Sequence, residues 1–291
     1  MNGAHALLAT LVDNGVTVCF ANPGTSEMHF VAALDDAPNM RGVLCLFEGV
    51  ATGAADGYAR VTRSPASTLL HLGPGLANGW ANLHNARRAH VPMVNIVGDH
   101  ATHHEIYDAP LQSNIESLVA PLEGWYRRST SPNDVARDAA DAIAESYGPP
   151  GVIATLVLPA DVSWNEITAP ISRPPIAQPV ASALDEDDIA LSVKVLTTRR
   201  TALVLGGSLT KEHFALGRRI AEATSSRLLM ETFPTFMDRG ANVADAERLI
   251  YVPEFAMDQL KDCEAIILVG AREPVSFFAY PHLASRLAPD V

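Results

Sequence analysis

The residues LFEGVATGAADGYAR at positions 46–60 decide which fold the sequence indicates. The run GVLCLF at 42–47 is continuously apolar, which is typical of a buried strand in a parallel sheet. Glu48 is the first polar residue after this run, and a helix-like segment with three glycines follows it. Each glycine costs a helix about 1 kcal/mol relative to alanine, so we expect a neighbouring backbone or a ligand to approach this helix closely.

Glu48 has two interpretations at this point. A carboxylate at the end of a parallel strand lies where open α/β sheets bind ligands, which favours a functional role. The alternative is a structural role. The helix dipole stabilises an acidic residue in the first turn, as Glu48 would be, and the glycines would permit tight packing of the helix. Residues 46–60 alone do not distinguish the functional from the structural interpretation of Glu48.

Strands and helices alternate along the remainder of the first half of the chain. Apolar runs bounded by turn residues predict strands at 16–20, 42–47, 67–71, 91–97 and 151–158. Helical patterns predict helices at 4–13, 49–61 and 134–146, and another that ends near residue 88. We therefore predict an α/β fold with a doubly wound parallel sheet over residues 1–165.

A second α/β unit follows a change in composition. Prolines are frequent between residues 166 and 183, which is typical of a semi-rigid linker between domains. Beyond it we predict strands at 202–206, 227–231 and 265–269 and helices at 185–196, 211–224 and 254–260. This pattern indicates a Rossmann-like domain over residues 184–291, which we expect to be incomplete because a further strand is expected after it.

Composition and charge exclude several classes of protein. The 291 residues are 48% hydrophobic and 19% charged, as in globular proteins, and the net charge of −12 opposes nucleic acid and anionic membrane surfaces as partners. No apolar run approaches the about 18 residues that cross a membrane, and the N-terminus lacks the features of a signal peptide. Cys19, Cys45 and Cys263 are few and far apart, which predicts unpaired structural thiols in a reducing cytoplasm.

Three predicted loops follow the first three strands and are expected to share one edge of the sheet. They contain NPGT at 22–25, EG at 48–49 and HLGPG at 71–75. A glutamate, a histidine and a hydroxyl that converge at this edge would form a site for proton transfer.

Three motifs at and beside these loops carry a resemblance to a known family: FANPGT at 20–25, Glu48 with GAADGYAR at 53–60, and GPGLANG at 73–79. In order and spacing they are similar to the N-terminal half of the thiamine-diphosphate-dependent decarboxylases and carboligases. That family includes acetolactate synthase and benzoylformate decarboxylase. The resemblance covers essentially the whole chain and is most specific over residues 16–100.

The resemblance implies that residues 1–165 form the pyrimidine-binding domain and that the later unit is the central domain. It also implies that Glu48 hydrogen-bonds N1′ of the aminopyrimidine and so promotes loss of the thiazolium C2 proton. The cofactor then attacks a 2-oxo acid and accepts electrons as carbon dioxide leaves. The residues implied to bind the cofactor are Asn22, Pro23, Gly24, Thr25, Glu48, Gly73, Gly75 and Asn78.

Other residues are candidates for contacts with the substrate. His71 stands where benzoylformate decarboxylase has an active-site histidine; it would bind the substrate carboxylate or protonate an intermediate, or else be a buried histidine bonded to backbone. Thr25 stands where that enzyme has a serine, and would bind substrate or cap the following helix. Gln112 lies near a family glutamine that reaches the active site from a neighbouring subunit. His103 and His104 are similar to paired histidines of pyruvate decarboxylase, but we expect them at the surface or an interface.

The third domain of the family, which binds the diphosphate and Mg²⁺, has no counterpart in this sequence. Its Gly-Asp-Gly motif with a downstream asparagine does not occur, and GDH at 98–100 is no substitute. We therefore expect thiamine diphosphate as cofactor, Mg²⁺ bound outside this chain with no metal ligand within it, and no activity of the chain alone. The family implies a homodimer or homotetramer, and it leaves FAD in the central domain open.

Four functions stay open at this stage. Acetolactate synthase-like decarboxylation and carboligation of 2-oxo acids is the first hypothesis, and benzoylformate decarboxylase-like decarboxylation is the second. A nicotinamide dehydrogenase is weaker, because GPG at 73–75 and Asp99 match its pattern only in part and Asn78 stands at the third glycine position. The fourth is a non-catalytic homologue kept for oligomerisation or regulation.

Overall fold

A computed structural model of the chain describes residues 1–169, 184–207, 209–241 and 246–288. The chain divides into two compact units, Met1–Ala181 and Ser182–Val291. Most of the predicted linker, residues 170–183, lies outside the described residues, so its conformation stays a prediction.

The first unit is built on a six-stranded sheet in which all strands are parallel. The strands lie in the order β2-β1-β3-β4-β6-β5. Their bounds are β1 Val18–Asn22, β2 Arg41–Leu44, β3 Ala66–Leu70, β4 Met93–Asp99, β5 Trp125–Arg128 and β6 Ile153–Pro159. The chain reverses its direction across the sheet between β1 and β3, because β2 lies on one side of β1 and β3 on the other. The predicted doubly wound α/β fold is confirmed.

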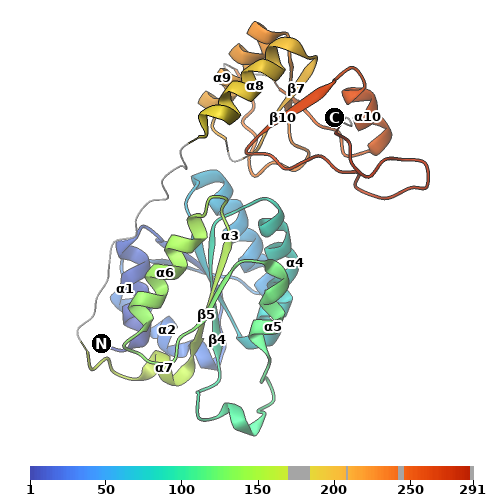
Figure 1. Ribbon diagram of the computed structural model, residues 1–291. Helices are drawn as coiled ribbons and strands as arrows, with labels where there is room; N and C mark the ends of the chain where they lie inside the picture. Colours follow the sequence, from blue (N-terminus) through green and yellow to red (C-terminus); the bar gives the residue numbers. More distant parts are fainter. Residues whose placement is uncertain (170–183, 208, 242–245, 289–291) are drawn as a thin grey trace. The chain divides into compact units, whose positions relative to one another are not determined.

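Helices cover both faces of this sheet (Figure 1). One face carries α1 Gly3–Asp13, α2 Met28–Ala33, α6 Val135–Tyr147 and α7 Ala160–Trp164, and its core includes Leu7, Phe30 and Ile143. The other face carries α3 Glu48–Thr62, α4 Leu72–Arg88 and α5 Ile115–Val119, and its core includes Ala55, Leu76 and Val119. Short 3₁₀ turns complete the unit: η1 Thr25–Glu27, η2 Leu34–Asp36, η3 Glu105–Tyr107 and η4 Ala120–Leu122. No helix in the described ranges is long and apolar enough to cross a membrane.

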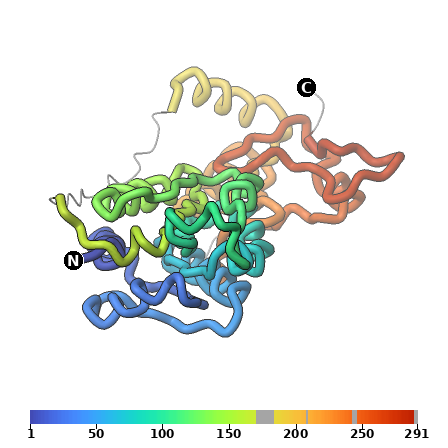
Figure 2. The backbone as a smooth tube through the Cα atoms, turned by 90° about the horizontal axis from the view of Figure 1, so that it is seen from below, coloured from blue at the N-terminus to red at the C-terminus, as the bar shows by residue number. Residues whose placement is uncertain are grey.

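The start and the end of the first unit are joined by backbone hydrogen bonds. Gly3 N–H donates to Asn165 O at 3.3 Å, and Ile167 N–H donates to Met1 O at 3.1 Å. Figure 2 shows the blue N-terminal segment beside the yellow-green segment that ends this unit. The first unit is therefore closed by its own termini.

The predicted buried strand at 42–47 is wrong in extent and in burial. The strand β2 ends at Leu44, and it is an edge strand with one neighbour, so Leu44 is 71% exposed and Leu46 is 91% exposed. An apolar run indicates a strand, but its place in the sheet depends on how the whole chain folds. The strand β1 also begins two residues later than predicted, and the short elements α5, α7 and β5 were missed. Most other predicted helices and strands agree within two or three residues.

The helix α3 packs closely on α4, and one of its glycines, Gly53, lies at this contact, where a Cβ would be 3.0 Å from Nδ2 of Asn82. Thr52 Oγ1 donates to the carbonyl of Gly79 at 3.1 Å, and Asn82 Nδ2 donates to the carbonyl of Gly49 at 2.6 Å. A Cβ on Gly79 would lie 2.7 Å from Cγ2 of Thr52, so a side chain there would separate the helices. A Cβ on Gly57 would meet no atom within 4 Å, so packing does not require glycine there.

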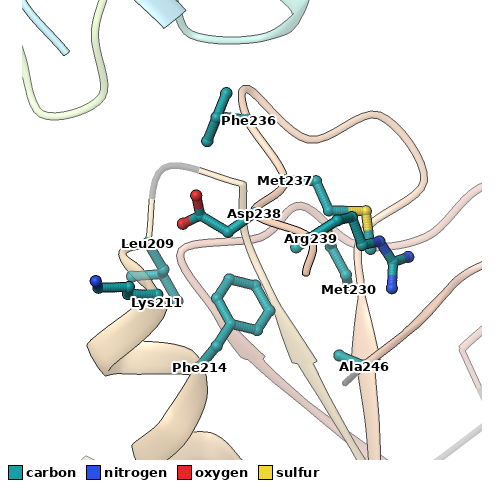
Figure 3. Close-up of a pocket in the computed structure, with 9 residues that line it drawn as sticks. All are labelled: Leu209, Lys211, Phe214, Met230, Phe236, Met237, Asp238, Arg239 and Ala246. Atoms are coloured by element: carbon teal, nitrogen blue, oxygen red, sulfur yellow. The ribbon is translucent and has the colours of Figure 1, made fainter. Parts of the chain in front are cut away.

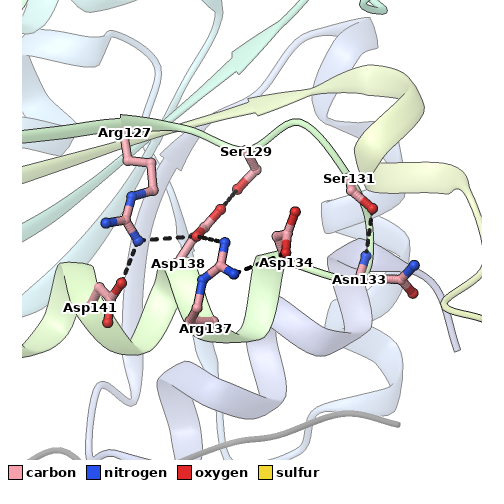
Figure 4. Close-up of polar contacts among 8 residues, drawn as sticks. All are labelled: Arg127, Ser129, Ser131, Asn133, Asp134, Arg137, Asp138 and Asp141. Atoms are coloured by element: carbon pink, nitrogen blue, oxygen red, sulfur yellow. Dashed lines mark hydrogen bonds and ion pairs between the residues drawn. The ribbon is translucent and has the colours of Figure 1, made fainter. Parts of the chain in front are cut away.

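A buried aspartate fixes the far edge of the same sheet (Figure 4). Asp138 in α6 is 2% exposed and accepts hydrogen bonds from Ser129 Oγ at 2.8 Å, Arg127 at 3.1 Å and Arg137 at 3.0 Å. Arg127 also lies over the ring of Trp125, 4.9 Å from its centroid. These contacts bind the end of β5 to α6. Arg127 also pairs with Asp141, and Arg137 also pairs with Asp134, so the donors are shared among carboxylates of α6 and its N-cap, which indicates a structural network.

The three cysteines are unpaired, as predicted. Cys19 and Cys45 are buried, and burial raises the pKa of the Cys19 thiol to about 12 and that of Cys45 above its ordinary value. A thiol with a raised pKa is a poor nucleophile near neutral pH. Both residues are therefore structural.

The second unit is a smaller parallel α/β unit with strand order β10-β7-β8-β9. Its elements are α8 Glu186–Thr198, β7 Thr201–Leu205, α9 Lys211–Thr224, β8 Arg227–Met230, β9 Glu247–Arg248, α10 Pro253–Leu260 and β10 Ala265–Val269. Gly206, after β7, approaches the backbone of Gly270, after β10, so closely that a Cβ would lie 1.8 Å from the Gly270 carbonyl oxygen. Backbone packing thus explains this glycine.

The contact between α3 and α4 predicts opposite effects for two glycine substitutions. Gly79→Ala should lower the free energy of unfolding by about 1–3 kcal/mol, because the new methyl group collides with buried Thr52. Gly57→Ala is the matched control and should raise it by about 0.5–1 kcal/mol. Urea unfolding followed by tryptophan fluorescence measures this, since Trp80, Trp125 and Trp164 all lie in the first unit. Equal effects of the two substitutions would contradict the packing argument.

Candidate functional site

The loops after β1 and β3 lie where the strand order reverses, which is the usual ligand site of a doubly wound sheet. The residues of the predicted site lie at this edge. Gly24 follows β1, Glu48 begins α3 after β2, and His71 follows β3. Contacts of Gly24 and Gly75 with these side chains show that the three loops meet.

Glu48 is the first residue of α3 and is only 5% exposed. Asn78 Nδ2, from α4, donates a hydrogen bond to Oε2 of Glu48 at 3.0 Å. A Cβ on Gly75 would lie 2.7 Å from Oε1 of Glu48 and 3.3 Å from Cβ of His71, so a side chain there would displace the carboxyl group of Glu48. Oε1 receives no hydrogen bond from the described part of the protein, which leaves this oxygen for a ligand.

His71 is three-quarters buried and is held by a residue that the sequence analysis did not assign. Its Nδ1 lies 2.7 Å from Oε2 of Glu27, and the N–H of Gly24 donates to the same oxygen at 2.8 Å. The imidazole lies against Gly24, where a Cβ would be 2.3 Å from ring atom Cε1. His71 is thus bonded to a carboxylate and not to backbone, and the alternative of a histidine satisfied by backbone is wrong.

Glu27 is 2% exposed, and Gly98 from the end of β4 covers it closely. Burial raises the pKa of Glu27 above its ordinary value, while hydrogen bonds from Gly24 and His71 and the nearby histidine oppose the rise. The sequence contains a partial signal for it. Glutamate in the third position of a helical turn often bonds back to the backbone before that turn, as Glu27 does with Gly24. The partner His71 lies 44 positions away, and no local pattern predicts that contact.

The turn between β3 and α4 has a strained backbone. Leu72 is buried with a φ of 52°, a left-handed conformation that is costly for a residue with a large side chain. Gly73 follows Leu72 and lies against Ser113. A Cβ added to Gly73 would lie 2.2 Å from the Cβ of Ser113. The loop that contains Gln112 therefore packs on this turn within one chain, and Oε1 of Gln112 is buried without a hydrogen-bond partner in the described structure.

The remaining predicted residues of the first loop lie beside the site but make few contacts with it. Asn22 ends β1, Pro23 follows it, and Thr25 is exposed at the start of η1. The expectation that Thr25 caps a helix is wrong. Gly24 holds the N-cap position of η1, and no side-chain hydrogen bond caps this turn. The hydroxyl of Thr25 is left for a ligand.

His103 and His104 are exposed, as predicted. Nδ1 of His103 lies 3.8 Å from Asp161, and His104 contacts the rings of His100 and Tyr107. Asp99 is 2% exposed and forms an ion pair with Arg128. The backbone N–H of His100 also donates a hydrogen bond to Asp99. The carboxylate of Asp99 is therefore already bonded within the protein, which argues against its role as the acidic ribose ligand of a nicotinamide dehydrogenase.

The described residues of the second unit enclose a small cavity. A cavity beyond the end of β8, lined by Leu209, Phe214, Met230 and Phe236 among others, has a volume of about 10 Å³ (Figure 3). This volume holds about one water molecule. Glu231, after β8, accepts a hydrogen bond from Gly207 N–H at 2.6 Å, and burial raises its pKa.

Comparison with known proteins identifies the first unit. The family model for the thiamine pyrophosphate enzyme, N-terminal TPP binding domain, matches residues 1–118. Residues 1–118 belong to this family. The matched part of this TPP-binding domain contains Glu27, Glu48 and His71, and it ends within α5.

Relatives of the TPP-binding domain extend the match to the second unit. The chain is 55% identical over 291 residues to the "Putative acetolactate synthase large subunit IlvX" of Mycobacterium tuberculosis (strain ATCC 25618 / H37Rv), covering 99% of this chain and 56% of that protein. It is 31% identical over 198 residues to benzoylformate decarboxylase of Pseudomonas aeruginosa, covering 66% of this chain and 37% of that protein. The structure of the Rhodococcus jostii RHA1 thiamine diphosphate-dependent 4-hydroxybenzoylformate decarboxylase superposes with a TM-score of 0.83 at 25% identity, covering 99% of this chain and 55% of that one. The chain therefore spans between about a third and about half of their lengths.

The buried position of Glu27 in the TPP-binding domain predicts an unusual pH dependence. A raised pKa means that the folded chain holds this proton more tightly than the unfolded chain, whose value is near 4.5. Relative to Glu27→Gln, the wild type should therefore be most stable below about pH 4.5 and lose stability as the pH rises through the raised pKa. The loss should be about 1.4 kcal/mol for each tenfold change in proton affinity. Urea unfolding of both proteins across this range measures it, and a constant difference would contradict the burial argument.

Proposed function

We propose that this chain supplies the pyrimidine-binding half of a thiamine diphosphate site, and that the complete assembly decarboxylates or carboligates 2-oxo acids. One observation carries the proposal. Glu48 is buried at the start of α3, Asn78 bonds one of its oxygens, and no described protein group bonds the other. A buried carboxyl oxygen without a protein partner fits a ligand nitrogen that shares a proton with it.

The residues around Glu48 fit the pyrimidine ring of the cofactor. Gly75 leaves space beside Oε1, and Asn78 fixes the carboxyl group by its hydrogen bond to Oε2. When bound, thiamine diphosphate supplies the nucleophilic carbon and the electron sink that cleavage beside a keto group needs. Glu48 would bind and orient the ring nitrogen and exchange a proton with it.

The substrate is proposed to meet His71 and Thr25. His71 presents Nε2 beside Gly24, and Thr25 presents an exposed hydroxyl on the same loop. An imidazole and a hydroxyl suit the carboxylate and keto oxygen of a 2-oxo acid. Gln112 is proposed as a further contact, because its loop packs on the turn that carries His71 and its Oε1 has no described partner.

The other half of the site is proposed to come from a diphosphate-binding domain with Mg²⁺. The described residues of this chain contain no group of acidic, histidine or cysteine side chains arranged to hold a metal ion. Leu46, Phe47 and Val50 flank Glu48 and are 91%, 48% and 57% exposed, which fits burial by a partner domain or subunit in a homodimer or homotetramer. The three unpaired thiols favour the cytoplasm.

Two observations divide the candidate reactions. The 55% identity over the whole chain to a protein named after acetolactate synthase favours carboligation. His71 and the benzoylformate decarboxylase relative favour simple decarboxylation. A non-catalytic role is less favoured, because Glu48 keeps its buried position, its Asn78 bond and the space beside Gly75.

A chimera tests the proposal: this chain joined to the part of IlvX that lies outside their alignment. With thiamine diphosphate and Mg²⁺, the chimera should exchange the thiazolium C2 proton, measured by ¹H NMR in D₂O, and convert pyruvate or benzoylformate. Glu48→Gln should slow exchange by about 10²-fold or more, as expected for loss of an acid–base group. The chain alone should show no exchange above buffer.

Glu116→Gln is the matched control, because Glu116 is an exposed glutamate of the same unit. It should leave the exchange rate unchanged. Wild-type exchange in Glu48→Gln would overturn the role of Glu48, and binding of reduced nicotinamide in place of thiamine diphosphate would favour a dehydrogenase. Acetolactate from pyruvate would identify a carboligase, and benzaldehyde from benzoylformate a decarboxylase.

A further inference from the structure

We propose that Glu27 is a positioning residue that keeps Nδ1 of His71 protonated, so that His71 exchanges hydrogen bonds and protons with a ligand only through Nε2. The 2-oxo acid as that ligand rests on the proposed function. The state of the imidazole is a property of this chain by itself.

The hydrogen bonds to Glu27 determine which atom is the donor. Oε2 of Glu27 lies 2.8 Å from Gly24 N and 2.7 Å from Nδ1 of His71. A backbone N–H can only donate, so Oε2 is already an acceptor. A carboxylate oxygen accepts two hydrogen bonds readily, whereas a carboxylic hydroxyl would have to donate to Nδ1 and accept from Gly24 with the same atom. The geometry therefore favours Nδ1–H as the second donor.

The surroundings of the pair hold this arrangement in place. Oε1 of Glu27 fills the space left by the missing side chain of Gly98, where a Cβ would lie 1.7 Å from this oxygen. The imidazole cannot move toward the β1 loop, because it already fills the space left by Gly24. Burial of the carboxylate to 2% exposure strengthens its hydrogen bonds by lowering the local dielectric constant.

The other ring nitrogen is left for a ligand. Nε2 of His71 forms no hydrogen bond with any described residue. The His71 side chain is 25% exposed. With Nδ1 protonated, neutral His71 offers a lone pair at Nε2, and its protonated form offers Nε2–H to a carboxylate while Glu27 balances the charge. His71 would then accept a proton from a ligand and donate it back through the same atom, Nε2. The imidazole ring does not need to turn between accepting the proton and donating it.

The two-bond ¹H–¹⁵N spectrum of the imidazole rings of the ¹⁵N-labelled chain tests this, at about pH 8.5, where an ordinary histidine is neutral. His71→Gln assigns the His71 signals. The wild type should show a protonated Nδ1 and an unprotonated Nε2. Glu27→Gln should keep this state, because its amide oxygen can accept from both Gly24 and Nδ1.

Glu27→Leu removes the acceptor and should shift the ratio of the two neutral forms of His71 by about tenfold or more toward Nε2–H. Asp36→Asn is the matched control, because Asp36 bonds Nε2 of His5 at 3.0 Å in an exposed pair, and it should leave His71 unchanged. An unprotonated Nδ1 in the wild type would overturn the proposal, even if Glu27→Leu does not fold. So would an unchanged His71 spectrum in folded Glu27→Leu.

These results are separate from those of the chimera. A chimera that fails to exchange the thiazolium proton would overturn the proposed function. The His71 spectrum of the chain would still test whether Glu27 keeps Nδ1 of His71 protonated. In an active chimera, kcat with a 2-oxo acid should fall in Glu27→Leu, and the double variant with His71→Gln should be no slower than His71→Gln alone, because Glu27 acts through His71. Additive losses would contradict that order.

Discussion

The close contact between α3 and the N-terminal half of α4 is the constraint on which the site depends. Gly75 and Gly79 let α4 approach so closely that Asn78 reaches Glu48, and Thr52 bonds the backbone of Gly79. A Cβ at Gly79 would press on the side chain of Thr52, and a Cβ at Gly75 would displace the carboxyl group of Glu48. The cost of glycine in these helices is therefore offset by the fixed position of one functional side chain.

Two buried glutamates lie at the same edge of the sheet in different environments. Glu27 has one oxygen bonded by Gly24 and His71 and the other covered by Gly98, so it is closed off from ligands. Glu48 has one oxygen bonded by Asn78 and the other without a described partner. A closed carboxylate can orient a neighbour, whereas an open one can exchange a proton with a ligand. The difference in hydrogen bonds is thus the basis for proposing different roles for two residues of one type.

Much of this fold could be predicted from the sequence, and the failures have physical causes. The alternation of apolar runs and helices predicted the parallel α/β sheet, and the position of Glu48 and His71 after strands predicted their edge. The exposure of Leu46 could not be predicted, because an apolar run does not state whether its strand lies at the centre or at the edge. The contact between Glu27 and His71 was missed because the two residues lie 44 positions apart.

The exposed apolar residues beside Glu48 connect the burial of this carboxyl group with the need for a partner. In the chain by itself, Leu46, Phe47 and Val50 lie in water directly beside a carboxyl group that is almost fully buried. Covering these residues would remove water from the remaining oxygen of Glu48 and strengthen its bond to a ring nitrogen. The apolar surface that would attract a second domain is thus the surface that would complete the dielectric environment of the site. Assembly and proton transfer would then depend on the same few residues.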